Sequence, residues 1–181
     1  MAAPSADKSS PVKEHGLQLT LRGDREIVLT RVFQAPRSLV FKAMTTPELA
    51  QRWLLGPPGW SMVKCEIDLR VGGVFRYEWC NADGAIMGMH GVYREIVPSE
   101  RIVSTESFYV GCEPQSGEQI ATASLSEDHG QTTLRCVVRY PSREARDATI
   151  ASGMEHGLAA SYDRLATLLT ATEQDGKRRP G

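Results

Sequence analysis

The stretch Ser142–Thr170, SREARDATIASGMEHGLAASYDRLATLLT, decides how the rest of the chain is interpreted. It contains no proline, and Ser142 suits the N-cap position because its hydroxyl can accept a hydrogen bond from a free first-turn amide. When its residues are placed at 100° intervals, the apolar ones gather on one face of a helix. These residues are Ile150, Ala151, Met154, Leu158, Leu165, Leu168 and Leu169. The pattern predicts one long helix that packs against an apolar surface.

Three polar residues, Glu155, Ser161 and Tyr162, fall within the same apolar face. A carboxylate against a packed core is strongly unfavourable unless it is paired or hydrated. We therefore expect either a wet cavity beside the middle of the helix or side chains that extend to its margins. Gly153 and Gly157 flank this face, and their missing side chains leave room for a close strand or for a ligand.

Length and charge limit the class of protein. The chain has 181 residues, enough for one domain with a real core, which we place at residues 17–172. Residues 1–16 and 173–181 are polar and are predicted to be disordered tails. The net charge of -1 gives no electrostatic reason to expect nucleic acid or an anionic membrane as a partner. The first residues lack the apolar core of a signal peptide, so we expect a cytoplasmic protein.

The four cysteines give no sign of a metal site or a disulfide framework. Cys65, Cys80, Cys112 and Cys136 are widely spaced, with no CxxC pair and no histidine at ligand spacing. We expect reduced thiols and no structural metal. No phosphate-binding glycine loop or nucleophile elbow occurs either, so we assign no cofactor and no catalytic residue.

Upstream of this helix, apolar and polar residues alternate in segments separated by turn residues. Arg25–Phe33 is predicted as the first main strand, and Leu17–Leu21 could form a short strand ahead of it. Two short helices follow, one opening at Pro36 and one at Thr46-Pro47. The later strands are expected at Val63–Arg70, Val74–Trp79, Ile86–Val97, Arg101–Val110, Gln119–Ser126 and Thr132–Tyr140.

This order predicts an α+β fold with its helices on one face of an antiparallel sheet. We expect a curved sheet of six to seven strands wrapped around the long C-terminal helix, with the two short helices after the first strand. The first strand is free to pair with the last. Openings to a cavity are expected at Glu48–Trp60 and at the loop Gly111–Gly117, because little hydrogen bonding would hold these segments.

Four segments resemble the START-like (SRPBCC) superfamily in order and spacing. They are LTRVFQAPRSLVFKAMTTPELAQRWLLGPPGW, CEIDLRVGGVFRYEW, GVYREIVPSERIV and GMEHGLAASYDRLATLL, within about Arg25–Leu169. Within the superfamily they are similar to the homologues of the activator of the heat-shock-protein-90 ATPase. The resemblance implies the helix-grip fold, in which a curved sheet grips the C-terminal helix, often with a cavity between them. It implies no universal catalytic residue.

The resemblance also implies a co-chaperone role for some relatives. The eukaryotic co-chaperone has an additional N-terminal domain that engages the chaperone. Only about two dozen residues precede the first main strand here, so we expect that domain to be absent. A chaperone contact is therefore ranked only third among the hypotheses, after ligand binding and catalysis.

Residues expected to line the cavity form the candidate ligand site. Methionine and aromatic side chains make adaptable apolar surfaces. Glu155 could bind a donor group or act as a general base, and the alternative is a salt bridge with a strand arginine such as Arg76 or Arg94. His90 could transfer a proton, or it could simply be hydrogen-bonded. The candidate set is Trp53, Phe75, Tyr77, Met87, Met89, His90, Phe108, Met154, Glu155, Leu158 and Tyr162.

The leading hypothesis is a protein that binds a small apolar or amphipathic molecule between sheet and helix. The second is a cyclase- or hydrolase-like enzyme that uses Glu155, His90 or Glu106 as a pocket acid or base. The choice between a monomer and a homodimer stays open.

Overall fold

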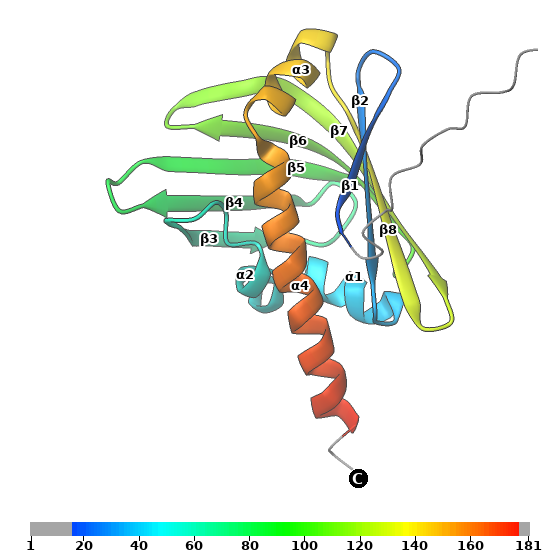
Figure 1. The fold of residues 1–181 in the computed structure, drawn as a ribbon. Helices are drawn as coiled ribbons and strands as arrows, with labels where there is room; N and C mark the ends of the chain where they lie inside the picture. The colour runs from blue at the N-terminus through cyan, green and yellow to red at the C-terminus, as the bar shows by residue number, and fades with distance from the viewer. Residues whose placement is uncertain (1–15, 178–181) are drawn as a thin grey trace, which may run out of the picture.

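One antiparallel sheet organises the fold in the computed structural model, which describes residues 16–177 (Figure 1). Its strand order is β1-β2-β8-β7-β6-β5-β4-β3. The strands are β1 (Gln18–Arg22), β2 (Glu26–Phe33), β3 (Trp60–Ile67), β4 (Val74–Asn81), β5 (Ile86–Val97), β6 (Arg101–Val110), β7 (Glu113–Asp128) and β8 (Gln131–Arg139). All neighbouring strands pair antiparallel, and short turns join each strand from β3 onward to the next.

Four helices accompany the sheet. Between β2 and β3 lie α1 (Arg37–Thr45) and α2 (Pro47–Trp53), and after β8 come α3 (Arg143–Ala151) and α4 (Met154–Lys177). In Figure 1, α4 crosses the concave side of the sheet, with α3 near one end of the sheet and α1 and α2 near the other. Within the described residues, no helix combines the length and the apolar character needed to cross a membrane.

The sheet has eight strands, one more than the upper limit of the predicted six to seven. The additional strand is β1, which corresponds to the segment Leu17–Leu21 that could form a short strand ahead of the first main one. Its residues Gln18–Arg22 pair with β2 along their whole length after a turn at Gly23. The predicted pairing of the first main strand with the last is confirmed, since β2 pairs with β8 from Glu26 to Phe33.

The prediction of a single long helix is wrong, because the chain breaks at Gly153. Ser142 is the N-cap as expected, and its Oγ accepts a hydrogen bond of 3.1 Å from the amide of Ala145. Gly153 has a φ of +75°, a conformation that side-chain-bearing residues rarely adopt, so α3 ends there and α4 starts afresh. The helical phase of Met154 and Glu155 relative to α3 therefore differs from that of a continuous helix.

The ends of the domain differ from the expected tails. Helix α4 continues to Lys177, five residues beyond Thr172, so the segment 173–177 is helical rather than a tail. The rest of the predicted C-terminal tail, and residues 1–15 of the predicted N-terminal tail, lie outside the described residues.

The loop expected at Gly111–Gly117 is largely part of the sheet. A tight turn at Gly111, whose φ is +63°, brings Glu113 opposite Val110, and β7 starts at once. This segment is therefore held by the β6–β7 hairpin and is a poor candidate for an opening.

The C-terminal half of α4 is anchored in the main core. Tyr162 and Leu165 of α4 pack with Phe33 of β2 and with Trp53 of α2 in one buried cluster. The Trp53 ring stacks on the Tyr162 ring with centroids 6.0 Å apart, and its Nε1 donates a 3.0 Å hydrogen bond to the carbonyl of Ala43 in α1. These contacts join α1, α2 and α4 to the sheet.

Candidate functional site

Strands β4, β5 and β6 carry an aromatic and thioether surface on the concave side of the sheet, which we call the aromatic wall. Its rings contact one another, with centroids 5.4 Å apart for Phe75 and Tyr77 and 5.2 Å apart for Phe75 and Tyr93. The buried members are Phe75, Tyr77, Trp79, Met87 and Tyr93, and the half-buried Met89 and Phe108 complete the wall. Because strand alternation sends every second side chain to one face, the wall is continuous across these strands.

Gly91 allows the wall to reach Glu106. It lies opposite Glu106 in the β5–β6 register, and the Phe75 ring occupies the space where a Gly91 side chain would be. Ser104, opposite Tyr93, and Phe108, opposite Met89, flank Glu106 along the same strand. The Glu106 carboxylate is therefore placed among the aromatic rings of the wall.

Neutral donors hold the Glu106 carboxylate. Gln119 Nε2 donates to Oε2 over 3.2 Å, and Ser104 Oγ donates to Oε1 over 3.4 Å. Burial raises the pKa of Glu106, and the bonds from Gln119 and Ser104 lower it only in part. In the described part of the chain this carboxylate forms no ion pair. A carboxylate in such surroundings is typical of functional sites.

Glu106 acts electrostatically on groups from several elements of the fold. Burial is the main reason that the pKa of Tyr93, of Cys136 and of Tyr140 rises to about 12, and the charge of Glu106 contributes in each case. The pKa of Tyr77 and that of Tyr162 rise for the same two reasons. The charge of Glu106 therefore acts on groups of β4, β5, β8 and α4 and on Tyr140, the residue after β8.

The structure separates the predicted ligand residues into groups. Five of them meet in the aromatic wall, namely Phe75, Tyr77, Met87, Met89 and Phe108. Trp53 and Tyr162 stack in the main core instead. Leu158 packs against a second buried cluster, which includes Ile27 and Leu29 of β2, and Met154 is half-buried at the start of α4.

Two predicted residues, His90 and Glu155, are exposed and lie away from the wall. Strand alternation points His90 to the opposite face of β5 from Met89, and its ring lies 5.9 Å from that of Tyr109. Glu155 follows the break at Gly153 and does not lie against the core. The alternative of a salt bridge with a strand arginine is also wrong, because within the described residues Glu155 pairs with neither Arg76 nor Arg94, and Arg76 Nη2 pairs with Glu78 Oε1 over 2.7 Å.

Sequence reasoning named Glu106 as an acid or base but left it, Ser104 and Gln119 out of the ligand set. The missing signal was available in β6, where Ile102, Ser104, Glu106 and Phe108 alternate toward the same face. Gln119 could not be placed, because its proximity to Glu106 depends on the β6–β7 register.

Open space lies beside Gly157 of α4. A Cβ atom there would have no heavy atom of another element within 4 Å. Gly157 lies one turn before Ser161, which is buried, so it shares the inward side of the helix. The alternative that the glycine admits a close strand is therefore wrong.

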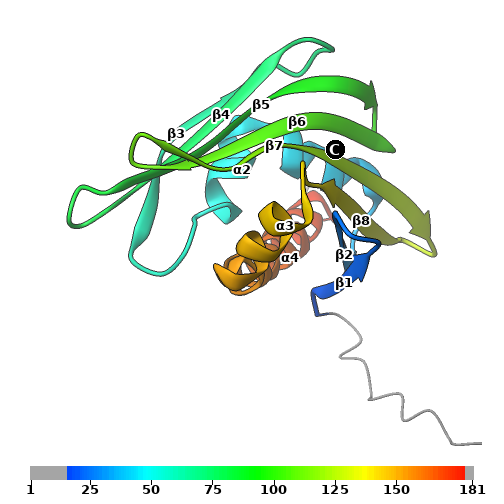
Figure 2. The ribbon, with the colours of Figure 1, turned by 90° about the horizontal axis from the view of Figure 1, so that it is seen from above.

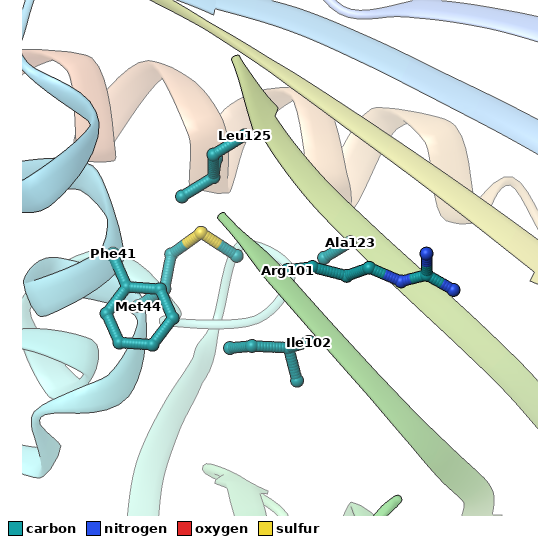
Figure 3. A pocket seen from close by; sticks show the side chains of 6 residues that line it. All are labelled: Phe41, Met44, Arg101, Ile102, Ala123 and Leu125. Atoms are coloured by element: carbon teal, nitrogen blue, oxygen red, sulfur yellow. The ribbon is translucent and has the colours of Figure 1, made fainter. Parts of the chain in front are cut away.

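Two further hollows lie away from the wall. A crevice of about 10 Å³ between α1 and strands β6 and β7 is lined by Phe41, Met44, Arg101, Ile102, Ala123 and Leu125. Figure 3 shows Phe41, Met44 and Ile102 converging while the Arg101 guanidinium points away. This volume suits about one water molecule.

A depression of about 580 Å³ near the β7–β8 turn is lined largely by polar residues, including Arg37, Glu127 and His129. Neither contains a predicted site residue.

The Glu106→Gln variant is expected to melt at a higher temperature than the wild type at neutral pH. Burial raises the pKa of Glu106 in the folded state above its pKa in the unfolded state. At a pH above the folded-state pKa, ionisation of Glu106 therefore destabilises the fold. At a pH below the unfolded-state pKa, Glu106 is protonated in both states and this cost is absent. The gain should therefore vanish as the pH falls below about 4. The surrounding Tyr77, Tyr93, Cys136, Tyr140 and Tyr162 have raised pKa values and stay uncharged in this range.

Thermal unfolding followed by circular dichroism across pH measures this effect. Glu155→Gln is the matched control, because it removes the same charge from an exposed position. Equal melting temperatures of Glu106→Gln and wild type at neutral pH would contradict the assignment.

A curved antiparallel sheet around a C-terminal helix, with a polar group set in an aromatic concave face, defines a helix-grip protein of the START-like superfamily. The chain belongs to the family described as "Activator of Hsp90 ATPase homolog 1-like protein", whose profile matches residues 34–170. This superfamily includes proteins that bind ligands or act as chaperone cofactors. No curated protein matches the chain.

Solved structures agree with this membership. A protein from Rhodobacter sphaeroides has 29% identity and a TM-score of 0.79, covering 86% of this chain and 99% of its own. Protein CV1439 from Chromobacterium violaceum has 31% identity and a TM-score of 0.67, covering 80% and 97%. Protein NE0264 from Nitrosomonas europaea, at 23% identity and a TM-score of 0.73, covers 85% and 99% and supports the fold alone.

Proposed function

We propose that the protein binds a small, mainly apolar molecule on the concave face, between the aromatic wall and the N-terminal half of α4. One observation carries the proposal. Among the described residues, none of the apolar side chains packed against the wall comes from α3 or α4. Figure 2 shows both helices beneath the curve of the sheet, on the side of β1, β2 and β8. As far as the structure describes them, helices α3 and α4 thus contribute no apolar cover to the wall, whose half-buried members are Met89 and Phe108.

The cover that the wall does have comes from the segment after α2. Leu54 and Trp60 pack against it, and Trp79 Nε1 donates a 2.9 Å hydrogen bond to the Leu54 carbonyl. The half-buried Met89 and Phe108 remain accessible to a ligand. An apolar surface with a few polar groups is typical of small-molecule sites, and methionine adapts to ligands of irregular shape.

The open space beside Gly157 provides a test. We expect 1-naphthalenemethanol, a neutral aromatic probe, to raise the melting temperature and to perturb the NMR signals of Met89 and Phe108. Gly157→Phe should fill the space and abolish both effects. His156→Phe adds the same ring at an exposed neighbouring position and should leave them intact.

Probe binding that survives Gly157→Phe unchanged would place the site elsewhere. If the probe neither raises the melting temperature nor perturbs the signals of the wall, the proposal fails.

A further inference from the structure

The hydrogen-bond partners of Glu106, and its lack of a cationic partner among the residues that the structure describes, indicate the chemical class of the ligand. Its two hydrogen-bond donors, from Gln119 and Ser104, are neutral. Its carboxylate forms no ion pair within the described residues, and protein surrounds it closely enough to disfavour its charge. Glu106 is half-buried, so a ligand can reach it, and a desolvated carboxylate without a cation would gain from one supplied from outside.

Arg31, a buried arginine, does not serve this purpose. Arg31 lies on β2, which β8 and β7 separate from β6 in the sheet. Its Nη2 already pairs with Asp163 of α4 over 2.8 Å. The site around Glu106 thus has a negative charge and no positive one to balance it.

The rings beside Glu106 favour the same sign of charge. Phe75 lies over Gly91, opposite Glu106, while Tyr93 and Phe108 occupy neighbouring positions on the same face. Aromatic faces attract cations through their quadrupoles, and this attraction grows when water is excluded. A carboxylate bordered by aromatic rings suits an ammonium group, whose apolar framework could contact Met89 and the rest of the wall.

Building on the proposed function, we propose that the ligand is an amine, whose positively charged nitrogen pairs with Glu106 while its apolar part lies on the aromatic wall. Gln119 and Ser104 already orient the carboxylate for this pairing. An anionic ligand of the same shape would meet repulsion from Glu106.

Three probes of one framework test this assignment: 1-naphthylmethylamine, 1-naphthalenemethanol and 1-naphthoate. Isothermal titration at neutral pH should show the amine binding about tenfold tighter than the alcohol, as expected for one charge-assisted hydrogen bond, and the carboxylate binding most weakly. In Glu106→Gln the amine and the alcohol should bind within about twofold of each other. The alcohol should lose little affinity, since its apolar contacts remain.

The control is Glu155→Gln, which removes the same negative charge at an exposed position and should keep the amine preference. Equal binding of amine and alcohol by the wild type, or an amine preference that survives Glu106→Gln, would overturn this inference and leave the proposed function standing. Tightest binding of 1-naphthoate would also overturn it and would indicate Arg31, whose Nε has no hydrogen-bond partner among the described residues. If none of the three probes binds, the inference falls together with the proposed function.

Discussion

Trp53→Ala is expected to lower the free energy of unfolding by about 3–5 kcal/mol, because it leaves a cavity where three helices meet the sheet. Trp53 is 5% exposed and stacks on Tyr162. The variant also leaves the Ala43 carbonyl without its partner, which adds a desolvation cost. Chemical denaturation followed by circular dichroism measures the loss.

Trp60→Ala provides the comparison for this experiment. Trp60 is half-buried at the start of β3 and packs at the margin of the aromatic wall rather than in the main core. Its removal should cost less than half as much as that of Trp53. Comparable losses for the two variants would mean that the anchoring of α4 does not depend on the stack of Trp53 on Tyr162.

Gly91→Ala should be about as damaging, with a loss of about 3 kcal/mol or more. The new methyl group would collide with the carbonyl oxygen of Thr105, a backbone atom of the paired strand, and would come within 2.6 Å of Phe75 Cζ. Neither can move away cheaply, because the oxygen belongs to β6 and the ring is 3% exposed within the wall. The β5–β6 pairing must therefore distort.

Gly157→Ala is the matched control, since the same methyl group enters open space on a helix. It should leave the fold unchanged or stabilise it by up to about 1 kcal/mol through helix propensity. Denaturation curves for both variants decide the point. A mild effect of Gly91→Ala would show that Phe75 does not need the position it occupies over Gly91.

The sequence pattern was sufficient to locate the strands and the wall, because alternation fixes which side chains share a face. The same alternation points the side chains of His90 and Met89 to opposite faces of β5. The sequence alone was therefore sufficient to leave His90 out of the site. The prediction of one continuous C-terminal helix was wrong for a different reason. A periodic apolar pattern continues across Ser152 and Gly153, and only the positive φ of Gly153 shows that the chain turns there.

The central position of Glu106 depends on long-range pairing. Its environment combines the β5–β6 register, the β6–β7 register and the placement of α4. These contacts join residues distant in sequence, so the local pattern could not show that Glu106 would lie without a cation.

The two halves of α4 meet different surroundings, and this has a consequence for how the protein can diversify. Tyr162 and Leu165 hold the helix in the main core. Gly157, which lies earlier in the same helix, borders open space. Substitutions at accessible wall positions such as Met89 and Phe108 therefore leave the anchoring contacts untouched. The proposed ligand site can therefore vary in sequence while the contacts that stabilise the fold through α4 are kept.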